Sequence, residues 1–478
     1  MRYGGSFGRG LSLASETRTK GNAVDMSIVF ASTNQRASSV DLGAALLRGQ
    51  AEDRGLYMPR PIPAFPPDLL KAARGLSYAE LAAAILEPYA EGVFTRKEIH
   101  EICADAYDYP VPLDVVTPGR CIMRLDQGPT ASFKDFAARF MGRAIGRLVR
   151  RQGRELLILV ATSGDTGSAV AHAFHNVEGI RVLVLFPKDE VSDRQRKQMT
   201  TLGDNVATIS LDGKFDDCQA LVKQAFSDPD LEQLHLSSAN SINIGRLLPQ
   251  SVYYVYAATQ LSDAAGGERV VFSVPSGNFG DMMGGLLAWR MGLPVERIVI
   301  ATNANDEVPR FLETGVYGKV EPSRICISNA MNVGHPSNLA RVVDLYGGVM
   351  DEKGTIHRAP DMNALRNDLF AVSISDEATR ETMRRVFRQH GVTLEPHGAV
   401  GWAGMETYVA QGGAETTTTI CLETAHPAKF PDEILSLTGV DPPLPPSLAG
   451  LDGLAERFGE MGADFAAFKA HLLQEYAS

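Results

Sequence analysis

One lysine in this sequence lies where its amine could act as a nucleophile. Lys134 belongs to residues 128–136 (GPTASFKDF), where a Gly-Pro turn precedes a helix expected to run to about Arg150. The positive end of the helix dipole and burial between Phe133 and Phe136 would both lower the pKa of the amine and keep part of it neutral. Taken alone, the same pattern also fits a solvated surface lysine.

A second stretch has the composition of a phosphate-binding loop. It follows an apolar strand-like run, precedes a helical pattern, and consists of Ser276, Gly277, Asn278, Phe279 and Gly280. Two glycines let backbone N–H groups converge on an anion at the start of a helix. A tight strand-to-helix turn without a ligand would use glycine as well. The lysine of a nucleotide-binding P-loop and the spacing of a dinucleotide fingerprint are both missing.

Two further loops offer groups to a second anion. The first, at residues 162–167 (TSGDTG), contains Ser163, Gly164, Asp165 and Thr166, and the second, at residues 240–246 (NSINIGR), contains Ser241, Asn243 and Arg246. Arginine binds phosphate with two parallel hydrogen bonds, and backbone amides suit a carboxylate. A helix cap at Asp165 or Ser163 and a structural arginine remain equally open.

The end of another buried strand supplies a hydroxyl. Thr424 follows the apolar run 417–422, at the position where ligands gather in open α/β sheets, although it could simply cap the strand. His172 and His175 lack a carboxylate-rich partner motif, so we predict that they are structural and that no metal is bound. His397 could reach a pocket, but a loop histidine is more often inert.

A buried lysine together with a backbone phosphate cradle suggests pyridoxal 5′-phosphate. The aldehyde of this cofactor requires an amine, and its phosphate requires amides. The elements needed to position these groups are also present, because apolar runs such as 156–160 and 270–274 alternate with helical patterns. This alternation predicts an α/β protein whose parallel sheets are covered on both faces.

The chain divides into five predicted parts. We expect a leader without fixed structure, a mostly helical N-terminal cap domain, a smaller mobile α/β domain carrying Lys134 and the substrate loop, a large α/β cofactor domain, and a linker with a C-terminal helix. Their bounds are residues 1–25, 26–115, 116–245, 246–440 and 441–478, respectively. The helices of the cap are predicted at 40–48, 67–73, 78–89 and 96–107.

Composition limits the classes of partner. The 478 residues carry 46 Lys and Arg against 57 Asp and Glu, so the formal charge is −11, which disfavours non-specific nucleic-acid binding. Five widely spaced cysteines without a CxxC motif indicate free thiols in a reducing cytoplasm. No apolar run is long enough to span a membrane. A small-molecule substrate and a monomeric or homodimeric protein are expected.

Taken together, the motifs of this sequence match a known family. The chain resembles the threonine synthases, which are pyridoxal-phosphate enzymes of fold type II with a tryptophan-synthase β-like fold. The motifs that carry the resemblance occur in family order: GPTASFKDF, ATSGDTG, FDDCQALVKQAF, SANSIN, SVPSGNFGD, ATNANDEVPRF, SNAMNV and TAHPAKF. Two positions depart from the family pattern, because Gln127 replaces a frequent histidine and Glu423 a small residue.

The resemblance implies roles for individual residues. Lys134 would form the Schiff base and move protons, residues 276–280 would hold the cofactor phosphate, and Thr424 would hydrogen-bond the pyridine nitrogen. Residues 163–166 would bind the substrate carboxylate, while Ser241, Asn243 and Arg246 would bind its phosphate.

The implied reaction converts O-phospho-L-homoserine and water to L-threonine and phosphate by β,γ-elimination and hydration. One alternative is a related fold-type II phospholyase or dehydratase that releases 2-oxobutyrate. A second is a non-catalytic protein that binds a phosphorylated metabolite.

Overall fold

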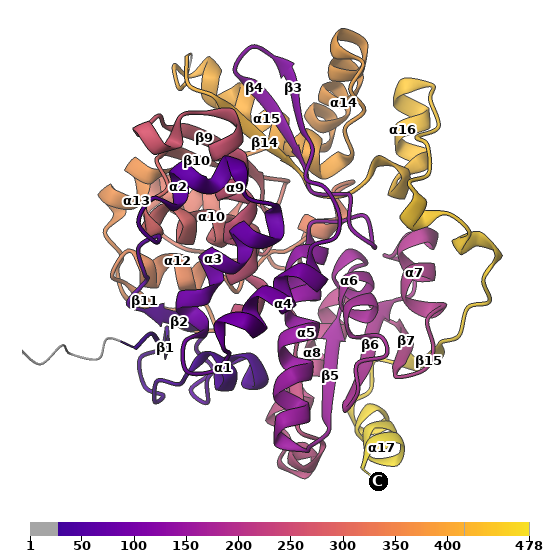
Figure 1. The fold of residues 1–478 in the computed structure, drawn as a ribbon. Coiled ribbons are helices and arrows are strands. Elements are labelled where there is room, and N and C mark those ends of the chain that lie inside the picture. The colour runs from indigo at the N-terminus through magenta and orange to yellow at the C-terminus, as the bar shows by residue number, and fades with distance from the viewer. Residues whose placement is uncertain (1–26, 415, 478) are drawn as a thin grey trace, which may run out of the picture.

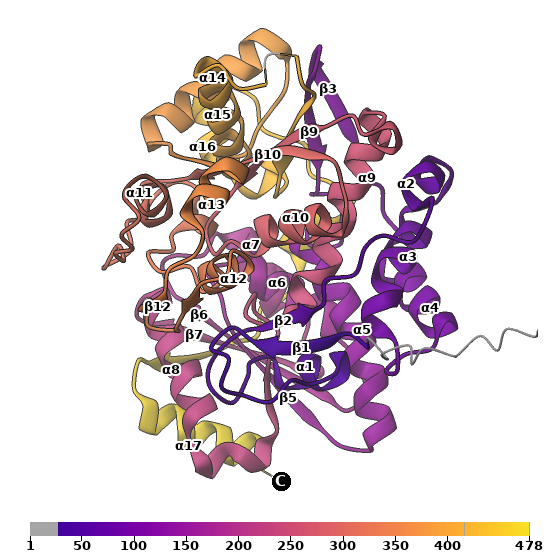
Figure 2. The same cartoon turned by 90° about the vertical axis from the view of Figure 1, so that its left-hand side faces the viewer.

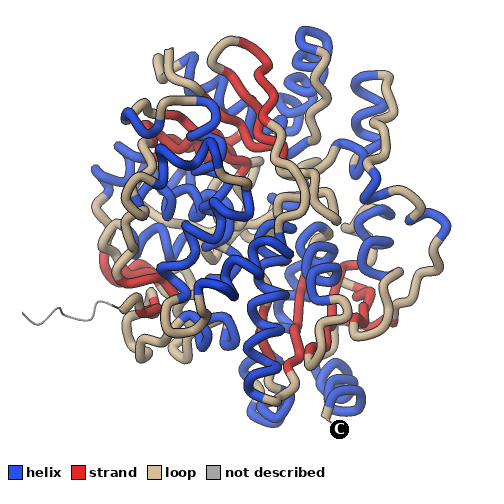
Figure 3. The backbone as a smooth tube through the Cα atoms, in the orientation of Figure 1, coloured by secondary structure: helices blue, strands red, loops and turns tan. Residues whose placement is uncertain are grey.

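The computed structural model describes residues 27–414 and 416–477, which contain two large, mainly parallel β-sheets with helices around them (Figure 1). The predicted leader, residues 1–25, lies outside the described residues. Figure 3 shows the strands of the larger sheet in the upper part of the view and those of the smaller sheet at the lower right. Within the described residues, no helix combines the length and the apolar composition that crossing a membrane requires.

The larger sheet has six strands, of which one edge strand is antiparallel and the others are parallel. In spatial order they are β13 (Leu369–Ser373), β10 (Val295–Thr302), β9 (Val270–Pro275), β14 (Thr419–Glu423), β4 (Arg120–Arg124) and β3 (Leu113–Thr117). One face is covered by α14 (Asp376–His390), α15 (Pro396–Ala410) and α16 (Pro431–Thr438), and the other by α9 (Ser251–Leu261) and α10 (Gly280–Met291).

The smaller sheet is entirely parallel. Its five strands are, in spatial order, β15 (Gly459–Gly462), β7 (Val206–Asp212), β6 (Ile180–Pro187), β5 (Leu156–Ala161) and β8 (Leu236–Ser238). Successive residues of a strand point to opposite faces. Ile158 and Val160 therefore join the central core with α5 (Lys134–Gln152) and α6 (Asp165–Phe174), whereas Leu157 and Leu159 pack toward α8 (Phe215–Ser227) and α17 (Phe465–Tyr476).

The N-terminal region is mostly helical, as predicted. It contains α1 (Leu42–Arg48), α2 (Leu69–Ala72), α3 (Tyr78–Ala90) and α4 (Arg96–Ala106), and Figure 2 shows α1 and α4 beside α5 (Lys134–Gln152). Capping boxes at Ser77 and Thr95 fix the starts of α3 and α4. The antiparallel pair β1 (Val29–Ser32) and β2 (Tyr57–Arg60) was not predicted from the sequence, because its four-residue strands are too short for a clear period.

Shorter elements complete the fold around the two sheets. They are α7 (Asp193–Thr200), α11 (Glu307–Thr314), α12 (Leu339–Leu345), α13 (Met362–Asp368), β11 (Val349–Met350) and β12 (Ile356–Arg358). Of these, α7 lies over the smaller sheet, next to α6 (Figure 1).

Two predicted boundaries differ from the arrangement of the sheets. Strands β3 and β4 belong to the larger sheet, although they fall within or beside the predicted smaller domain of residues 116–245. The region predicted as linker and final helix does contain α17, but β15 precedes that helix and extends the smaller sheet by pairing with β7. Both differences have one reason: the neighbour of a strand is set by long-range packing, which local composition does not encode.

Candidate active site

Lys134 is the first residue of α5 and faces the cavity between the two sheets. The turn before it is held by Thr130, whose N–H and hydroxyl donate to the Asp135 carboxylate at 2.8 and 2.6 Å. The same turn pairs with the segment after β14, since Phe133 N–H donates to Thr424 O at 2.9 Å. These contacts place the amine beside the carboxyl end of β14.

The surroundings of Lys134 favour its neutral form. Its side chain is 11% exposed, and its Nζ lies 3.8 Å from Asp165 Oδ2. Burial lowers the pKa of the amine; Asp165 acts in the opposite direction, whereas Arg246 and Lys429 lower it further. The net effect is a pKa below the usual lysine value, as a nucleophilic amine requires.

Residues 276–280 form a narrow loop between β9 and α10. A Cβ atom on Gly277 would lie 2.7 Å from Met331 Cα, so only glycine fits. Asn278 anchors the loop, because its side-chain oxygen accepts from Ser337 N–H at 2.7 Å. Among the described residues, the N–H groups of residues 277–279 have no hydrogen-bond acceptor. Free amides around a glycine cradle fit a phosphate group.

The loop between β5 and α6 lies across the cavity. Thr162 Oγ1 accepts from Gly164 N–H at 2.9 Å and from Gly167 N–H at 2.8 Å, which fixes the loop. Gly164 has φ 130° and lies against Gln195, while Ser163 and Thr166 line the cavity. Asp165 lines it too, but its carboxylate is already bound by Lys429 and Gln195, which leaves only its backbone for a substrate carboxylate.

Arg246 is a buried cation without a carboxylate partner among the described residues. It ends a short 3-10 helix, η3 (Ile244–Arg246), and is 3% exposed. Its Nη1 donates to Ala239 O at 2.7 Å, its Nε has no partner, and burial lowers its pKa to about 10. Ser241 lies in the same wall of the cavity. An unpaired guanidinium facing a cavity is suited to an anionic ligand.

Asn243 does not line the cavity. Its position therefore differs from the expectation that it binds the substrate phosphate. Its Nδ2 donates to Leu46 O and Ser238 O, each at 2.9 Å, and its Oδ1 accepts from Gly245 N–H at 3.0 Å. The side-chain nitrogen and oxygen of Asn243 are thus both bonded to backbone groups of this chain, and the side chain is fully buried. Asn243 therefore caps η3 and joins it to α1, which positions Arg246 but leaves no group for a phosphate.

Thr424 directly follows β14 and lines the cavity, with its Oγ1 donating to Glu395 Oε1 at 3.4 Å. Glu423 points away from the cavity and accepts from Glu395 N–H at 2.9 Å. Burial and the nearby Glu395 carboxylate raise the pKa of Glu423 well above its usual value. Gln127, the other departure from the family pattern, donates to Asp126 Oδ1 at 2.7 Å.

Three residues of the site were not predicted from the sequence. Asp281 lines the cavity, accepts from Tyr253 and Tyr254 hydroxyls at 2.6 and 2.8 Å, and has a pKa raised by burial to about 6. His397, expected to be inert, also lines the cavity and accepts from Ala330 N–H at 3.1 Å. Lys429 is fully buried against Asp165. Asp281 lies within the motif SVPSGNFGD and Lys429 within TAHPAKF. Membership of these motifs was the only indication in the sequence that the two residues belong to the site.

The fold and this site define a class of protein. A family model described as pyridoxal-phosphate dependent enzyme matches residues 120–424, and the chain belongs to that class. The cofactor of the class is pyridoxal 5′-phosphate, as expected from Lys134 and the glycine loop. The two-sheet arrangement confirms the predicted fold type.

The family within this class follows from longer matches. Models of the threonine synthase N terminus and C-terminal region match residues 29–107 and 398–472. Threonine synthase of Haemophilus influenzae is 39% identical over 436 residues, covering 91% of this chain and 97% of that protein. Threonine synthase of Escherichia coli is 38% identical, covering 90% and 96%. The chain belongs to the threonine synthase family.

Solved structures agree with this assignment. The crystal structure of threonine synthase from Brucella melitensis with bound PLP has a TM-score of 0.86 at 34% identity, covering 95% of this chain and 100% of that one. The Escherichia coli structure has a TM-score of 0.84 at 36% identity, covering 93% and 99%.

Proposed function

We propose that this chain converts O-phospho-L-homoserine and water into L-threonine and phosphate. The observation that carries the proposal is the gathering of three features in one cavity. They are the buried amine of Lys134, the amides of residues 277–279, and the guanidinium of Arg246; among residues 27–414 and 416–477, these amides have no acceptor and Arg246 has no carboxylate partner. A phosphorylated aldehyde cofactor supplies a carbonyl for the amine of Lys134 and a phosphate for the amides of residues 277–279. A phosphorylated amino acid supplies a second phosphate for Arg246.

The cofactor contacts are assigned to the residues that fit them. Lys134 would bind the aldehyde, the Thr424 hydroxyl would contact the ring nitrogen, and the loop Ser276, Gly277, Asn278, Phe279 and Gly280 would hold the phosphate. When bound, the cofactor supplies a ring that takes up electrons from the carbon bearing the amino group.

Lys134 is proposed to move the proton at this carbon. A neutral amine can accept a proton, and burial keeps the pKa of Lys134 low enough for that form. The Asp165 carboxylate, 3.8 Å from Nζ, stabilises the ammonium once it forms. The same nitrogen can then return the proton to the product.

The substrate contacts come from both sheets. Arg246 and Ser241 would bind the substrate phosphate, and the N–H groups of residues 163–166 would bind its carboxylate. In this scheme protons leave the α- and β-carbons, the bond between the γ-carbon and oxygen breaks, and phosphate keeps the bridging oxygen. Water then adds its hydroxyl at the β-carbon and gives its other proton to phosphate, while the two protons removed earlier are replaced at the γ-carbon, which becomes the methyl group, and at the α-carbon. Tight positioning of both anionic ends holds the reacting carbons beside Lys134.

We also propose that the smaller sheet unit closes over bound substrate, because the cavity must exclude water during elimination. The opposing loops 163–166 and 276–280 belong to different sheets, which supports such a movement. Small-angle X-ray scattering should show a smaller radius of gyration when phosphohomoserine is added. An unchanged scattering curve would contradict the closure.

Product analysis in H₂¹⁸O tests the reaction. The purified protein with pyridoxal phosphate and phosphohomoserine should yield threonine labelled in its hydroxyl group and unlabelled phosphate. Formation of 2-oxobutyrate and ammonia would replace the proposal with the dehydratase alternative. Binding of phosphohomoserine without turnover would replace it with the non-catalytic alternative.

We propose a cytoplasmic protein that acts as a monomer or homodimer and binds no nucleic acid. Support comes from the five cysteines, which are all free and buried, and from the net charge of −11. Cell fractionation and sedimentation velocity test this assignment. Recovery from a membrane fraction, a larger assembly, or binding to DNA at physiological salt would each contradict it.

A further inference from the structure

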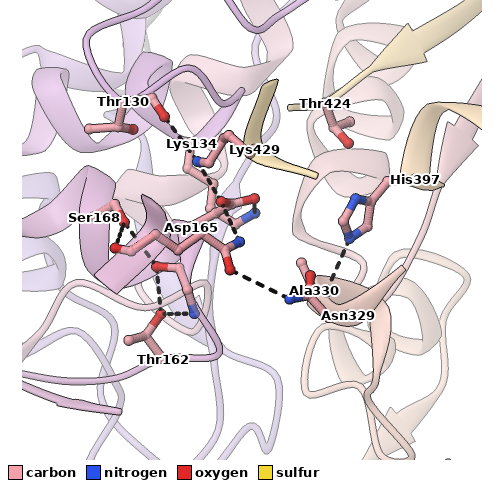
Figure 4. A network of polar contacts seen from close by, with 12 residues as sticks. Thr130, Lys134, Thr162, Asp165, Ser168, Asn329, Ala330, His397, Thr424 and Lys429 are labelled. Carbon is pink, nitrogen blue, oxygen red and sulfur yellow. Dashed lines mark hydrogen bonds and ion pairs between the residues drawn. The ribbon is translucent and has the colours of Figure 1, made fainter. Parts of the chain in front are cut away.

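A second buried lysine shares the carboxylate that faces Lys134. Lys429 is 0% exposed and its Nζ lies 2.6 Å from Asp165 Oδ1, while Lys134 Nζ lies 3.8 Å from Asp165 Oδ2. Figure 4 shows both ammonium groups directed at the same side chain. Asp165 is 2% exposed, so water does little to screen this cluster.

The three residues come from different parts of the fold. Asp165 begins α6 beside the smaller sheet, whereas Lys429 ends the 3-10 helix η7 (Pro427–Lys429), which follows β14 of the larger sheet. Lys429 Nζ also donates to Thr130 O at 3.0 Å, in the turn that leads to Lys134. Lys429 thus contacts both the partner carboxylate of Lys134 and the turn that carries it.

The charges in this cluster do not balance. One carboxylate can neutralise one ammonium, and the shorter contact goes to Lys429. Lys134 also faces the Arg246 cation from η3 and the Asp281 carboxylate from α10, and Asp281 is itself inclined to hold a proton because burial raises its pKa to about 6. A proton on Lys134 is therefore only partly compensated, and losing it relieves repulsion from Lys429 and Arg246.

We propose that Lys429 is a positioning residue that occupies Asp165, and thereby keeps the amine of Lys134 free to bind the cofactor aldehyde. This inference rests on the proposed function, because it presumes that Lys134 binds the cofactor. It assigns a purpose to a buried lysine whose burial would otherwise only cost free energy.

The test measures how the reactivity of Lys134 depends on pH. The full-length protein, freed of cofactor, is mixed with pyridoxal phosphate over a range of pH, and the rate at which the visible absorbance appears is recorded. Borohydride reduction and peptide mapping then identify the lysine that has reacted. The pH of half-maximal rate reports the ionisation of the Lys134 amine. Pyridoxal phosphate also titrates, but its contribution is the same for all variants, so differences between variants come from the protein.

Lys429→Met should raise this half-maximal pH by about one unit or more, because Asp165 is then left to pair with Lys134 alone. Lys429→Arg should restore the wild-type value. Arg194→Met is the matched control: Arg194 is a cation that contacts the same loop at Ala428 O but not Asp165. It should leave the value unchanged.

Asp165→Asn should shift the half-maximal pH in the opposite direction. It also keeps the inference testable if Lys429→Met does not fold. Losing the carboxylate should lower the half-maximal pH. An unchanged value in Lys429→Met, an equal shift in Arg194→Met, or an unchanged or raised value in Asp165→Asn would each overturn the inference. If wild-type protein reacts at a lysine other than Lys134, the proposed function itself fails.

Discussion

Gly277 offers a direct test of the phosphate cradle. Replacing it with alanine places a Cβ atom 2.7 Å from Met331 Cα and 3.1 Å from Ala330 O. Both neighbours are backbone atoms, so the loop or the segment 328–331 must move for the methyl group to fit. Overpacking of this kind costs about 1–3 kcal/mol. If the loop takes up this strain, pyridoxal phosphate should bind roughly 5- to 150-fold more weakly, at tenfold per 1.4 kcal/mol.

The assay is an equilibrium titration of cofactor-free protein with pyridoxal phosphate, followed by absorbance. Gly280→Ala is the matched control in the same loop, because the nearest neighbours of its Cβ would all be side-chain atoms, with Ser241 Cβ the nearest at 3.2 Å. It should weaken binding much less than Gly277→Ala. Urea unfolding separates a local effect from loss of the fold. A Gly277→Ala protein that binds the cofactor within twofold of wild type would refute the cradle.

Three further outcomes are expected. Lys134→Ala should lose the visible absorbance of the bound cofactor and all turnover, and an absorbance that borohydride still shifts would assign the amine elsewhere. Arg246→Met should raise KM for phosphohomoserine at least about tenfold while the cofactor absorbance stays, in line with the strength of charged hydrogen bonds; unchanged kinetics would remove Arg246 from the phosphate site. Asp281, whose pKa rises from 3.8 to about 6 on folding, binds more protons in the folded state than in the unfolded state between these values. Stability should therefore fall as pH rises through this window, by up to about 3 kcal/mol, and Asp281→Asn should remove that part of the fall in urea unfolding; parallel pH profiles for the two proteins would contradict it.

Much of the site was predictable because its loops have local signatures. Residues 276–280 and 162–167 each lie between an apolar run and a helix, and the structure places both loops at the carboxyl ends of parallel strands, β9 and β5. Lys134 was recognisable for the same reason, as the first turn of a helix after a Gly-Pro turn. All three features depend on residues close together in the chain.

Asn243 and His397 show where local reading failed. The polar stretch 240–246 suggested three substrate contacts, yet Asn243 is bound to α1 through Leu46 O and to Ser238 O. His397 looked like an ordinary loop histidine, but it lies in the first turn of α15, lines the cavity and accepts from Ala330 N–H. In both cases one partner, Leu46 or Ala330, is distant in the sequence, so the pattern around the residue carries no information about it.

The sequence by itself determined the class of fold and the places of Lys134 and the glycine loop 276–280 at the starts of helices, because turns and strand-to-helix loops are governed by neighbouring residues and their backbone preferences. Only the tertiary structure decided that β15 completes the smaller sheet and that Lys429 meets Asp165. Those pairings depend on which strands and loops become neighbours when the two sheets pack. The energy of a buried charge is set by that environment rather than by the residues beside it in the chain.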